Sequence, residues 1–524
     1  MIFRAACDII FCRNTGAEHR VCNFLWTRRD TVGIFKALRE KYSLIRFLVE
    51  AQKTVWYPVL FAALCTIAGT NNYKMYIPIL WVLTAFVLFS ALFADDNKVF
   101  LTPLLMIFFS LGCDTERDAF LESNGDMLSF MSPKAFPWVI VICAICVSAF
   151  VIRLFADGSV AAAFKKRRRM TIGIIAMDIA FLANGILSPT YSARDFGLGA
   201  FLAMGFTVVY FLVSGMLENS RDVVKYACVV MLGTAYVAFL QIMTVLLRKH
   251  LEGDKFLFIG ADGGMLINRT ELTLGWGVTT VVAAVFILGI PAAMYLAKNC
   301  RFSAFSYVSA VFFLIGAVLI NTRASMAVGA VAFVVCVILC LFSKKNRLYI
   351  CIYSGLLLIF TACALIIIHV KIIPLDSLIR KMIDILRIGG GDSGRSLLWQ
   401  NGIEDFKSSP VFGIGFNNGA YEDAARRENF YSNMYHCILV QIPASMGIVG
   451  GIAFLLHCAE LCILCFKKFS ANKLLVLLVP LMILALSLVD NFFFYLHFQI
   501  FYGALLAVAE TMLKEDSAKS SALT

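Results

Sequence analysis

Long apolar segments, separated by short polar connections, recur along almost the whole chain. Runs of about 17–25 apolar residues with few charges are typical of helices that span a lipid bilayer. We count about fourteen such runs, centred near residues 62, 84, 106, 146, 180, 208, 236, 285, 312, 333, 359, 450, 480 and 503. Because the runs are continuous and do not alternate with polar residues, they predict an all-α polytopic membrane protein and exclude a transmembrane β-barrel.

One long polar stretch, residues 371–433, interrupts this pattern. It predicts a large extracytoplasmic loop built of short helices. Apolar residues recur at helical spacing in 375–387, which predicts an amphipathic helix along the outer membrane surface. Ser396–Lys407 predicts a second short helix. The next apolar segment, Met434–Phe466, contains a proline and several glycines, and we expect a kinked or tilted helix there.

These elements divide the chain into five parts. They are a basic N-terminal segment (1–53), eleven spans (54–370), the large loop (371–433), three further spans (434–513) and a short tail (514–524). The first part lacks the apolar core and small-residue cleavage site of a signal peptide, so we expect it to lie in the cytoplasm. We expect no soluble domain.

The charge of the chain is explained by membrane topology. Of its residues, 60% are hydrophobic and 15% are charged, and the net charge is +12. Basic residues gather in connections on one side of the predicted membrane, including Lys165–Arg169, Lys344–Arg347 and Lys467–Lys468. Because short cytoplasmic loops carry an excess of Lys and Arg, both termini are predicted to be cytoplasmic. The positive charge therefore does not indicate a nucleic-acid partner, and we expect none.

Two arginines are candidates for binding a negatively charged group. Arg323 lies between two apolar runs that leave almost no room for a loop, so it sits at or just inside the external membrane boundary. A charge at the bilayer centre costs about 2.5–3.5 kcal/mol, so such residues usually face a cavity or a partner, although an arginine can also snorkel to lipid phosphate. Arg395 opens a short helix after a glycine-rich turn, where its guanidinium and the free backbone amides suit a phosphate or diphosphate.

Other candidates come from single polar residues at the external side or within apolar runs. His436 enters a span directly from the large loop, where a neutral imidazole can accept a proton from a hydroxyl or merely anchor the helix. Asp178 and Asp490 are acids within apolar segments, and an internal hydrogen bond could equally satisfy them. Arg194 could add to a cationic site or pair with Asp195. The external side shows no histidine cluster or acidic triad, so we expect no metal site.

Four short motifs occur in order in the second half of the chain. They are Thr322-Arg323, Gly394-Arg395-x3-Trp399, Pro410-x2-Gly413-x-Gly415, and His436 followed by Met446-Gly-Ile-Val-Gly450. In order, spacing and topology, this succession resembles the O-antigen ligase/polymerase superfamily over roughly residues 305–465. That superfamily consists of polytopic glycosyltransferases acting on glycans linked to undecaprenyl diphosphate. The chain departs from the family pattern next to Arg323 and His436, where Ala324 replaces a frequent glycine and Cys437 a frequent asparagine.

The resemblance implies a metal-independent, inverting glycosyltransferase of surface-polysaccharide biosynthesis in the inner or plasma membrane. Its donor would be a polyprenyl-diphosphate-linked glycan, with no other cofactor, and its acceptor a glycan or a lipid. Arg323 and Arg395 would hold the diphosphate and stabilise the charge that develops as it leaves. His436 would deprotonate or orient the acceptor hydroxyl. Arg194 and Asp490 are additional candidates for the site, and polysaccharide-assembly proteins are candidate partners.

The sequence leaves several alternatives open. A polymerase and a ligase share the donor chemistry and differ in the acceptor, and about fourteen spans favour a polymerase slightly because ligases of this family typically have fewer. The competing class is a flippase for a polysaccharide or lipid-linked oligosaccharide. A flippase needs two pseudo-symmetric halves, whereas this chain has dissimilar halves and the 371–433 insertion. A membrane receptor or scaffold is a third reading, and the sugar, linkage and acceptor stay open.

Overall fold

The computed structural model describes residues 35–521 with the exception of 71–72, 111–135, 166–167, 189–192, 219, 252–256, 260–264, 268–273, 275, 321, 343–345, 372–394 and 417–434. The described residues form helices and one small antiparallel hairpin, in which β1 (Leu257–Ile259) pairs with β2 (Met265–Ile267). The predicted all-helical fold is otherwise confirmed. The predicted amphipathic helix at 375–387 lies outside the described residues.

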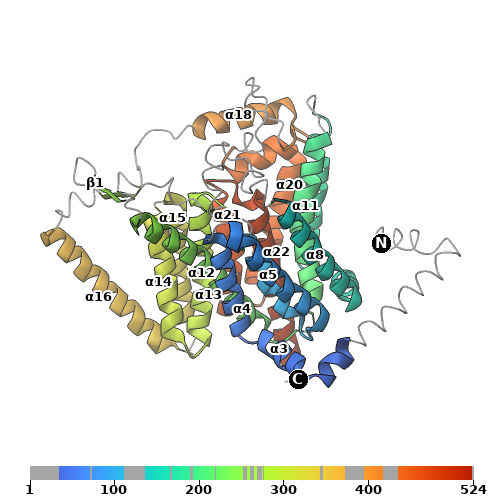
Figure 1. The fold of residues 1–524 in the computed structure, drawn as a ribbon. Helices are drawn as coiled ribbons and strands as arrows, with labels where there is room; N and C mark the ends of the chain where they lie inside the picture. The colour runs from blue at the N-terminus through green and yellow to red at the C-terminus, as the bar shows by residue number, and fades with distance from the viewer. Residues whose placement is uncertain are drawn as a thin grey trace.

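The first half of the chain is a succession of mostly apolar helices (Figure 1). They are α3 (Ser43–Gln52), α4 (Trp56–Thr70), α5 (Tyr73–Phe93), η1 (Asn97–Phe100), α6 (Leu101–Met106), η2 (Ile107–Ser110), α8 (Phe136–Ala156), α9 (Ser159–Lys165), α10 (Thr171–Ala183), α11 (Ala193–Met216) and α12 (Val223–Leu251).

The second half of the chain also consists mostly of apolar helices. Its elements are α13 (Thr279–Asn299), α14 (Ser303–Leu319), α15 (Arg323–Leu341), α16 (Arg347–Lys371), α18 (Arg395–Ser408), α20 (Ile438–Phe466), α21 (Ala471–Leu486), η6 (Phe492–Phe494) and α22 (Leu496–Ser521). Helix α18 caps the upper end of the bundle in Figure 1, and α16 stands apart at the left.

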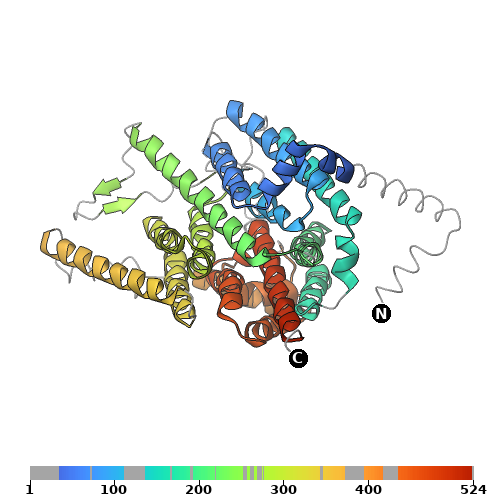
Figure 2. The same ribbon diagram turned by 90° about the horizontal axis from the view of Figure 1, so that it is seen from below.

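The bundle is built around a few helices that are apolar on every side. Helix α13 packs against α12, α14, α15 and α21, and every residue from Val281 to Lys298 is buried. Helix α22 packs against α11, α12 and α21, and Figure 2 shows it near the middle of the bundle. Helices at the rim, such as α16, leave large apolar side chains exposed, among them Leu358 and Phe360. Such apolar outer surfaces suit contact with lipid chains.

The described helices are long and apolar enough for a multi-pass membrane protein. Seven of them satisfy the length and composition of a membrane span, in the ranges Tyr76–Phe93, Pro137–Phe155, Val223–Arg248, Thr279–Asn299, Arg323–Leu341, Ile438–Phe466 and Leu496–Leu513. Further apolar helices, α4, α10, α14 and α21 among them, have 10–17 residues. Each predicted span centre falls within a helix or its immediate 3-10 continuation. The total of about fourteen spans stays a prediction.

The kink that the sequence predicts in Met434–Phe466 is confirmed. Helix α20 breaks at Gly447, where φ is 62° and ψ is −157°. Glycine adopts this backbone conformation readily, whereas a side chain would make it strained. The break divides α20 into a short first part, which leads away from His436, and a long second part.

Candidate active site

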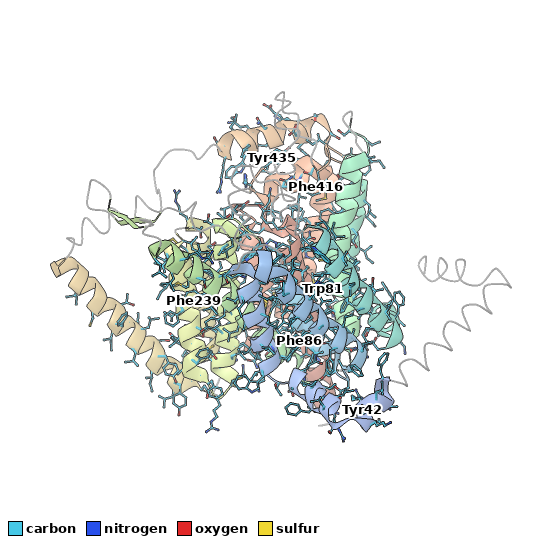
Figure 3. The ribbon with its side chains drawn as sticks, in the orientation of Figure 1. Tyr42, Trp81, Phe86, Phe239, Phe416 and Tyr435 are labelled. Atoms are coloured by element: carbon cyan, nitrogen blue, oxygen red, sulfur yellow. The ribbon has the colours of Figure 1, made fainter. Side chains whose placement is uncertain are left out.

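His436 lies in the short non-helical entry to α20, on the side of the bundle that α18 covers. Figure 3 shows its neighbour Tyr435 directly below α18. The backbone of His436 has a φ of 51°, in the left-handed region that non-glycine residues rarely occupy. A conformation of this kind costs about 1–3 kcal/mol and persists where the surrounding structure holds it in place, often at functional sites. Hydrogen bonds of the His436 ring and of the adjoining Tyr435 hold the backbone in this conformation.

The ring of His436 is paired with Asp490. Its Nδ1 lies 2.9 Å from Oδ1 of Asp490, and the same oxygen accepts a 2.7 Å hydrogen bond from the backbone N–H of Asn491. The side chain of His436 is 40% exposed and that of Asp490 is 13% exposed. When Nδ1–H donates to the carboxylate, the lone pair of Nε2 is left to accept a proton. The arrangement therefore suits a general base with a fixed tautomer.

A buried polar network holds this pair against α20. Oε1 of Gln441 accepts from the backbone N–H of Tyr435 at 3.0 Å and from Nδ2 of Asn491 at 2.9 Å. Nε2 of Gln441 in turn donates to Oγ of Ser445 at 2.8 Å. Gln441, Ser445 and Asn491 are all buried. Because these bonds fix the residues next to His436 and next to Asp490, they fix the relative position of the imidazole and the carboxylate.

Helix α18 is tied to the same segment. Nε1 of Trp399 donates to the backbone carbonyl of Tyr435 at 3.1 Å, and the hydroxyl of Tyr435 donates to Oδ2 of Asp405. Arg395 is the first residue of α18 and is half-buried. The N-terminus of a helix carries a partial positive charge, which together with the guanidinium of Arg395 favours an anionic ligand. The structure thus places Arg395 on the element that is fastened to the entry of α20.

Arg323 begins α15, directly after the buried residue Thr322. Helix α15 packs against α13 and α21, and α21 leads into Asp490. Among the residues that the structure describes, the hydroxyl of Thr322 and Oδ1 of Asn491 are buried and have no hydrogen-bond partner. Polar atoms of this kind are costly unless a water or ligand satisfies them. Two such atoms therefore lie next to the candidate residues Arg323 and Asp490. Arg194 lies in the first turn of α11, and its side chain is outside the described part.

The pairing of His436 with Asp490 was not evident from the sequence. Asp490 stands out there only as an acid in an apolar segment, and the two residues are 54 positions apart. Tyr435, Asp405 and Gln441 gave a weaker signal, because single polar residues near apolar runs are common. Asp178, the other acid within an apolar segment, accepts a hydrogen bond from Thr207 of α11. The structure thus shows for Asp178 the internal hydrogen bond that the sequence analysis gave as one of two interpretations.

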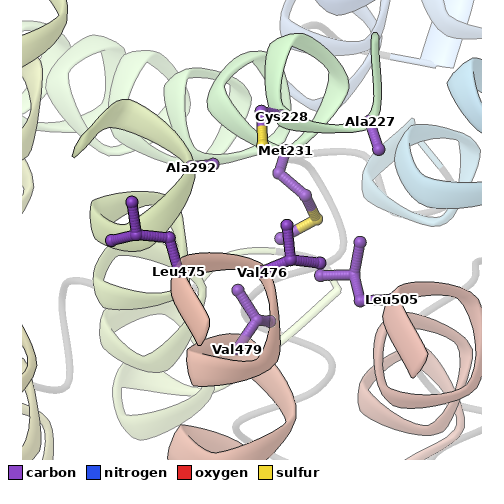
Figure 4. A pocket seen from close by; sticks show the side chains of 8 residues that line it. All are labelled: Ala227, Cys228, Met231, Ala292, Leu475, Val476, Val479 and Leu505. Atoms are coloured by element: carbon purple, nitrogen blue, oxygen red, sulfur yellow. The ribbon is translucent and has the colours of Figure 1, made fainter. Parts of the chain in front are cut away.

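The described residues contain no group of three or more His, Cys, Asp or Glu side chains placed to hold a metal ion. Figure 4 shows a void between α12, α13, α21 and α22, with Met231, Val476 and Leu505 among its lining residues. Its lining side chains are apolar, and none belongs to the polar site around His436. The void therefore offers no groups that would recognise a sugar or a diphosphate.

The bond between Tyr435 and Asp405 should contribute measurably to stability. Replacing Tyr435 with phenylalanine removes the hydroxyl that donates to a carboxylate only 4% exposed. Loss of a partner for a buried polar group costs about 1–3 kcal/mol, so the variant should unfold at a lower temperature in detergent. Tyr349→Phe is the matched control, because Tyr349 is 54% exposed on α16. Equal unfolding temperatures for the two variants would contradict the assigned role of the hydroxyl.

Comparison with known protein families gives a match in the second half of the chain. Residues 308–455 match the family model described as O-antigen ligase. The matched range runs from α14 into α20 and includes Arg323, Arg395 and His436, whereas Asp490 lies beyond it. A search of curated proteins found no match. The resemblance stated from the motifs is therefore confirmed over residues 308–455, where the chain is similar to the O-antigen ligase family.

Proposed function

We propose that this protein is a membrane glycosyltransferase that transfers a glycan from a polyprenyl diphosphate to an acceptor hydroxyl at the outer face of the membrane. One observation carries the proposal. Nδ1 of His436 lies 2.9 Å from Oδ1 of Asp490, and the adjoining Tyr435 is bonded to the helix that begins with Arg395. With Nδ1–H donating to Asp490, Nε2 of His436 is left to accept a proton. Both His436 and Arg395 lie within the O-antigen ligase match.

In the proposed reaction, His436 acts on the acceptor. Its Nε2 accepts the proton of an acceptor hydroxyl, and the hydroxyl oxygen attacks the anomeric carbon of the donor glycan. The bond between that carbon and the diphosphate oxygen breaks, and polyprenyl diphosphate leaves with the bonding electrons. Asp490 stabilises the imidazolium that forms, as the carboxylate does in other histidine-based sites. Direct displacement inverts the anomeric centre.

The two arginines act on the donor in this scheme. Arg395 and Arg323 bind the diphosphate and neutralise the negative charge that grows on it in the transition state. A planar guanidinium can contact two phosphate oxygens at once, so it orients the leaving group as well as attracting it. With that charge supplied by arginines, the proposal needs neither a metal ion nor a nucleotide sugar. Arg194, in the first turn of α11, is an additional candidate cation.

The proposed setting is the inner or plasma membrane, with both termini in the cytoplasm, as the distribution of Lys and Arg favours. The substrates would be a lipid-linked glycan and a glycan or lipid acceptor, and polysaccharide-assembly proteins are candidate partners. Polymerase and ligase remain the two forms of this proposal. The family match does not favour the flippase alternative, because the matched family is one of O-antigen ligases.

Reconstitution tests the proposal and separates its forms. The purified protein in liposomes is given a radiolabelled polyprenyl-diphosphate oligosaccharide, with chelator and without nucleotide sugar. Lengthening of the lipid-linked glycan would identify a polymerase, and movement of label to a different added acceptor would identify a ligase. Label that only changes leaflet, at equal rates for wild type and His436→Ala, would contradict the enzyme and support the flippase.

A further inference from the structure

We propose that the segment Pro410–Gly415, here called the strap, is a clamp that positions His436 by stabilising the break in α20 at Gly447. The inference rests on the proposed function, because it assigns the strap a part in that reaction. The strap follows α18 directly, and it lies across the break in α20. It therefore connects the helix that carries Arg395 with the helix that His436 enters.

The strap replaces two hydrogen bonds that an unbroken α20 would make within itself. In a continuous helix, the N–H groups of Ile448 and Val449 would donate to the carbonyls of Ala444 and Ser445. Instead, Ile448 N–H donates to the carbonyl of Pro410 at 2.8 Å, and Val449 N–H donates to the carbonyl of Val411 at 3.2 Å.

The two carbonyls that the break releases are satisfied from the same strap. The carbonyl of Ala444 accepts from Ile414 N–H at 2.9 Å, and the carbonyl of Ser445 accepts from Gly415 N–H at 3.0 Å. Irregular backbone within a membrane-embedded protein is tolerated only where its polar groups find such partners. Each of the four backbone groups that lose a partner within α20 therefore finds a new hydrogen-bond partner in the strap, and these bonds stabilise the break.

Two glycines make this close approach geometrically feasible. Gly413 has a φ of 68°, and a Cβ added to it would lie 2.2 Å from the backbone carbon of Ser445. Gly447 has a φ of 62°, and its Cβ would lie 2.3 Å from the carbonyl oxygen of Val411. Both positions therefore exclude any larger residue on conformational grounds and on steric grounds. The close contact between the strap and the break in α20 therefore requires glycine at both positions.

The strap and the residue after it are also bonded to the residues that follow α10. The N–H of Gly185 donates to the carbonyl of Phe412 at 2.9 Å, and Oδ1 of Asn184 accepts from the N–H of Phe416 at 3.0 Å. Figure 3 shows Phe416 near Tyr435 at the upper end of the bundle. Because α10 and α18 both anchor the strap, the strap forms a fixed point against which the first part of α20 is set.

The first part of α20 transmits that position to His436. Ser445, whose carbonyl the strap binds, accepts a hydrogen bond from Gln441 through its hydroxyl. Gln441 in turn binds the N–H of Tyr435 and the amide of Asn491, the neighbours of His436 and Asp490. If the strap were released, the freed groups of Ala444, Ser445, Ile448 and Val449 could bond to one another in a continuous helix. His436 would then lose the orientation that faces Asp490.

Gly447→Ala tests this positioning role, and Gly451→Ala is the matched control. Gly451 lies in the same helix, and a Cβ there would meet nothing within 4 Å. In Gly447→Ala we expect faster amide exchange at Ile414 and Gly415 and a fall in kcat of about 100-fold, typical of misplaced catalytic groups. Donor affinity should stay at the wild-type value, because Arg395 and Arg323 are untouched. Gly451→Ala should match wild type in every measurement.

Ser445→Ala provides a milder variant that keeps the backbone of the strap intact. It removes only the hydroxyl that accepts from Gln441. We expect wild-type exchange at Ile414 and Gly415 together with a reduced kcat. An unchanged kcat in both Ser445→Ala and a folded Gly447→Ala would overturn the positioning role.

Amide exchange in the wild type separates this inference from the proposed function. Slow exchange at Ile414, Gly415, Ile448 and Val449 is expected whatever reaction the protein catalyses, because these four N–H groups are bonded across the break. Fast exchange at the strap would overturn the clamp even in an active enzyme. Absence of transfer by a wild type with a protected strap would overturn the proposed function alone.

Discussion

Replacing His436 with alanine is expected to lower the rate of glycan transfer by about 10²–10⁴-fold, the usual contribution of a positioned general base. This size of effect is expected because the pairing of Nδ1 of His436 with Asp490 would leave Nε2 to accept the proton of the acceptor hydroxyl. Affinity for the lipid-linked donor should change little, since the proposed diphosphate ligands remain. The measurement is the initial rate in liposomes, together with donor binding to the same preparation.

Asp490→Asn sharpens this test. The asparagine keeps nearly the same shape, but it can no longer stabilise a positively charged ring and can hold the wrong tautomer. We expect a fall in kcat that is large but smaller than in His436→Ala, with donor affinity again preserved. A His436→Ala variant that transfers at the wild-type rate would show that His436 is only an interfacial anchor, the second reading that its position in the sequence allows.

Replacing Arg395 with alanine is expected to lower transfer by about 10²–10³-fold, the range found when one charge-stabilising group is removed from an active site. Donor affinity should fall as well, because Arg395 would contact the diphosphate before and during the reaction. Arg395→Lys should recover only part of the activity, since lysine keeps the charge but loses the planar fork that binds two oxygens. Rates and donor dissociation constants of the three proteins provide the measurement.

Lys407→Ala is the control for Arg395, because it removes an exposed cation near the other end of the same helix. It should behave as wild type, since a solvent-exposed charge contributes little at physiological salt. If Lys407→Ala and Arg395→Ala lowered transfer equally, the effect would come from the general positive charge of α18. The assignment of Arg395 to the diphosphate would then be wrong.

Much of the fold could be predicted because membrane-spanning helices carry a local signal. Continuous apolar runs marked helices such as α13 and α15. The short helix predicted at Ser396–Lys407 is within one residue of the bounds of α18 at each end. The kink in α20 was also predictable, because proline and glycine in an apolar run weaken a helix at that point. The hairpin of β1 and β2 was not predicted, since its strands are only three residues long.

The site could be predicted only as a set of separate residues. Arg323, Arg395 and His436 each carry a local anomaly, a charge or an imidazole at a membrane boundary. Their partners are set by tertiary packing. Asp490 meets His436 because the end of α21 lies against the start of α20, where Ile438 N–H donates to the carbonyl of Ser487 at 2.7 Å. No periodicity along the chain reports such a contact between segments distant in sequence.

The configuration of the glycosidic bond that the protein forms tests the central claim most directly. A purified polyprenyl-diphosphate oligosaccharide of known anomeric configuration is supplied as the sole sugar donor, and the new linkage in the isolated product is assigned by NMR. We predict transfer with the opposite configuration at the anomeric carbon, because the hydroxyl activated by His436 would displace the diphosphate in one step. A product with the configuration of the donor, or no product from a folded protein supplied with its acceptor, would contradict it.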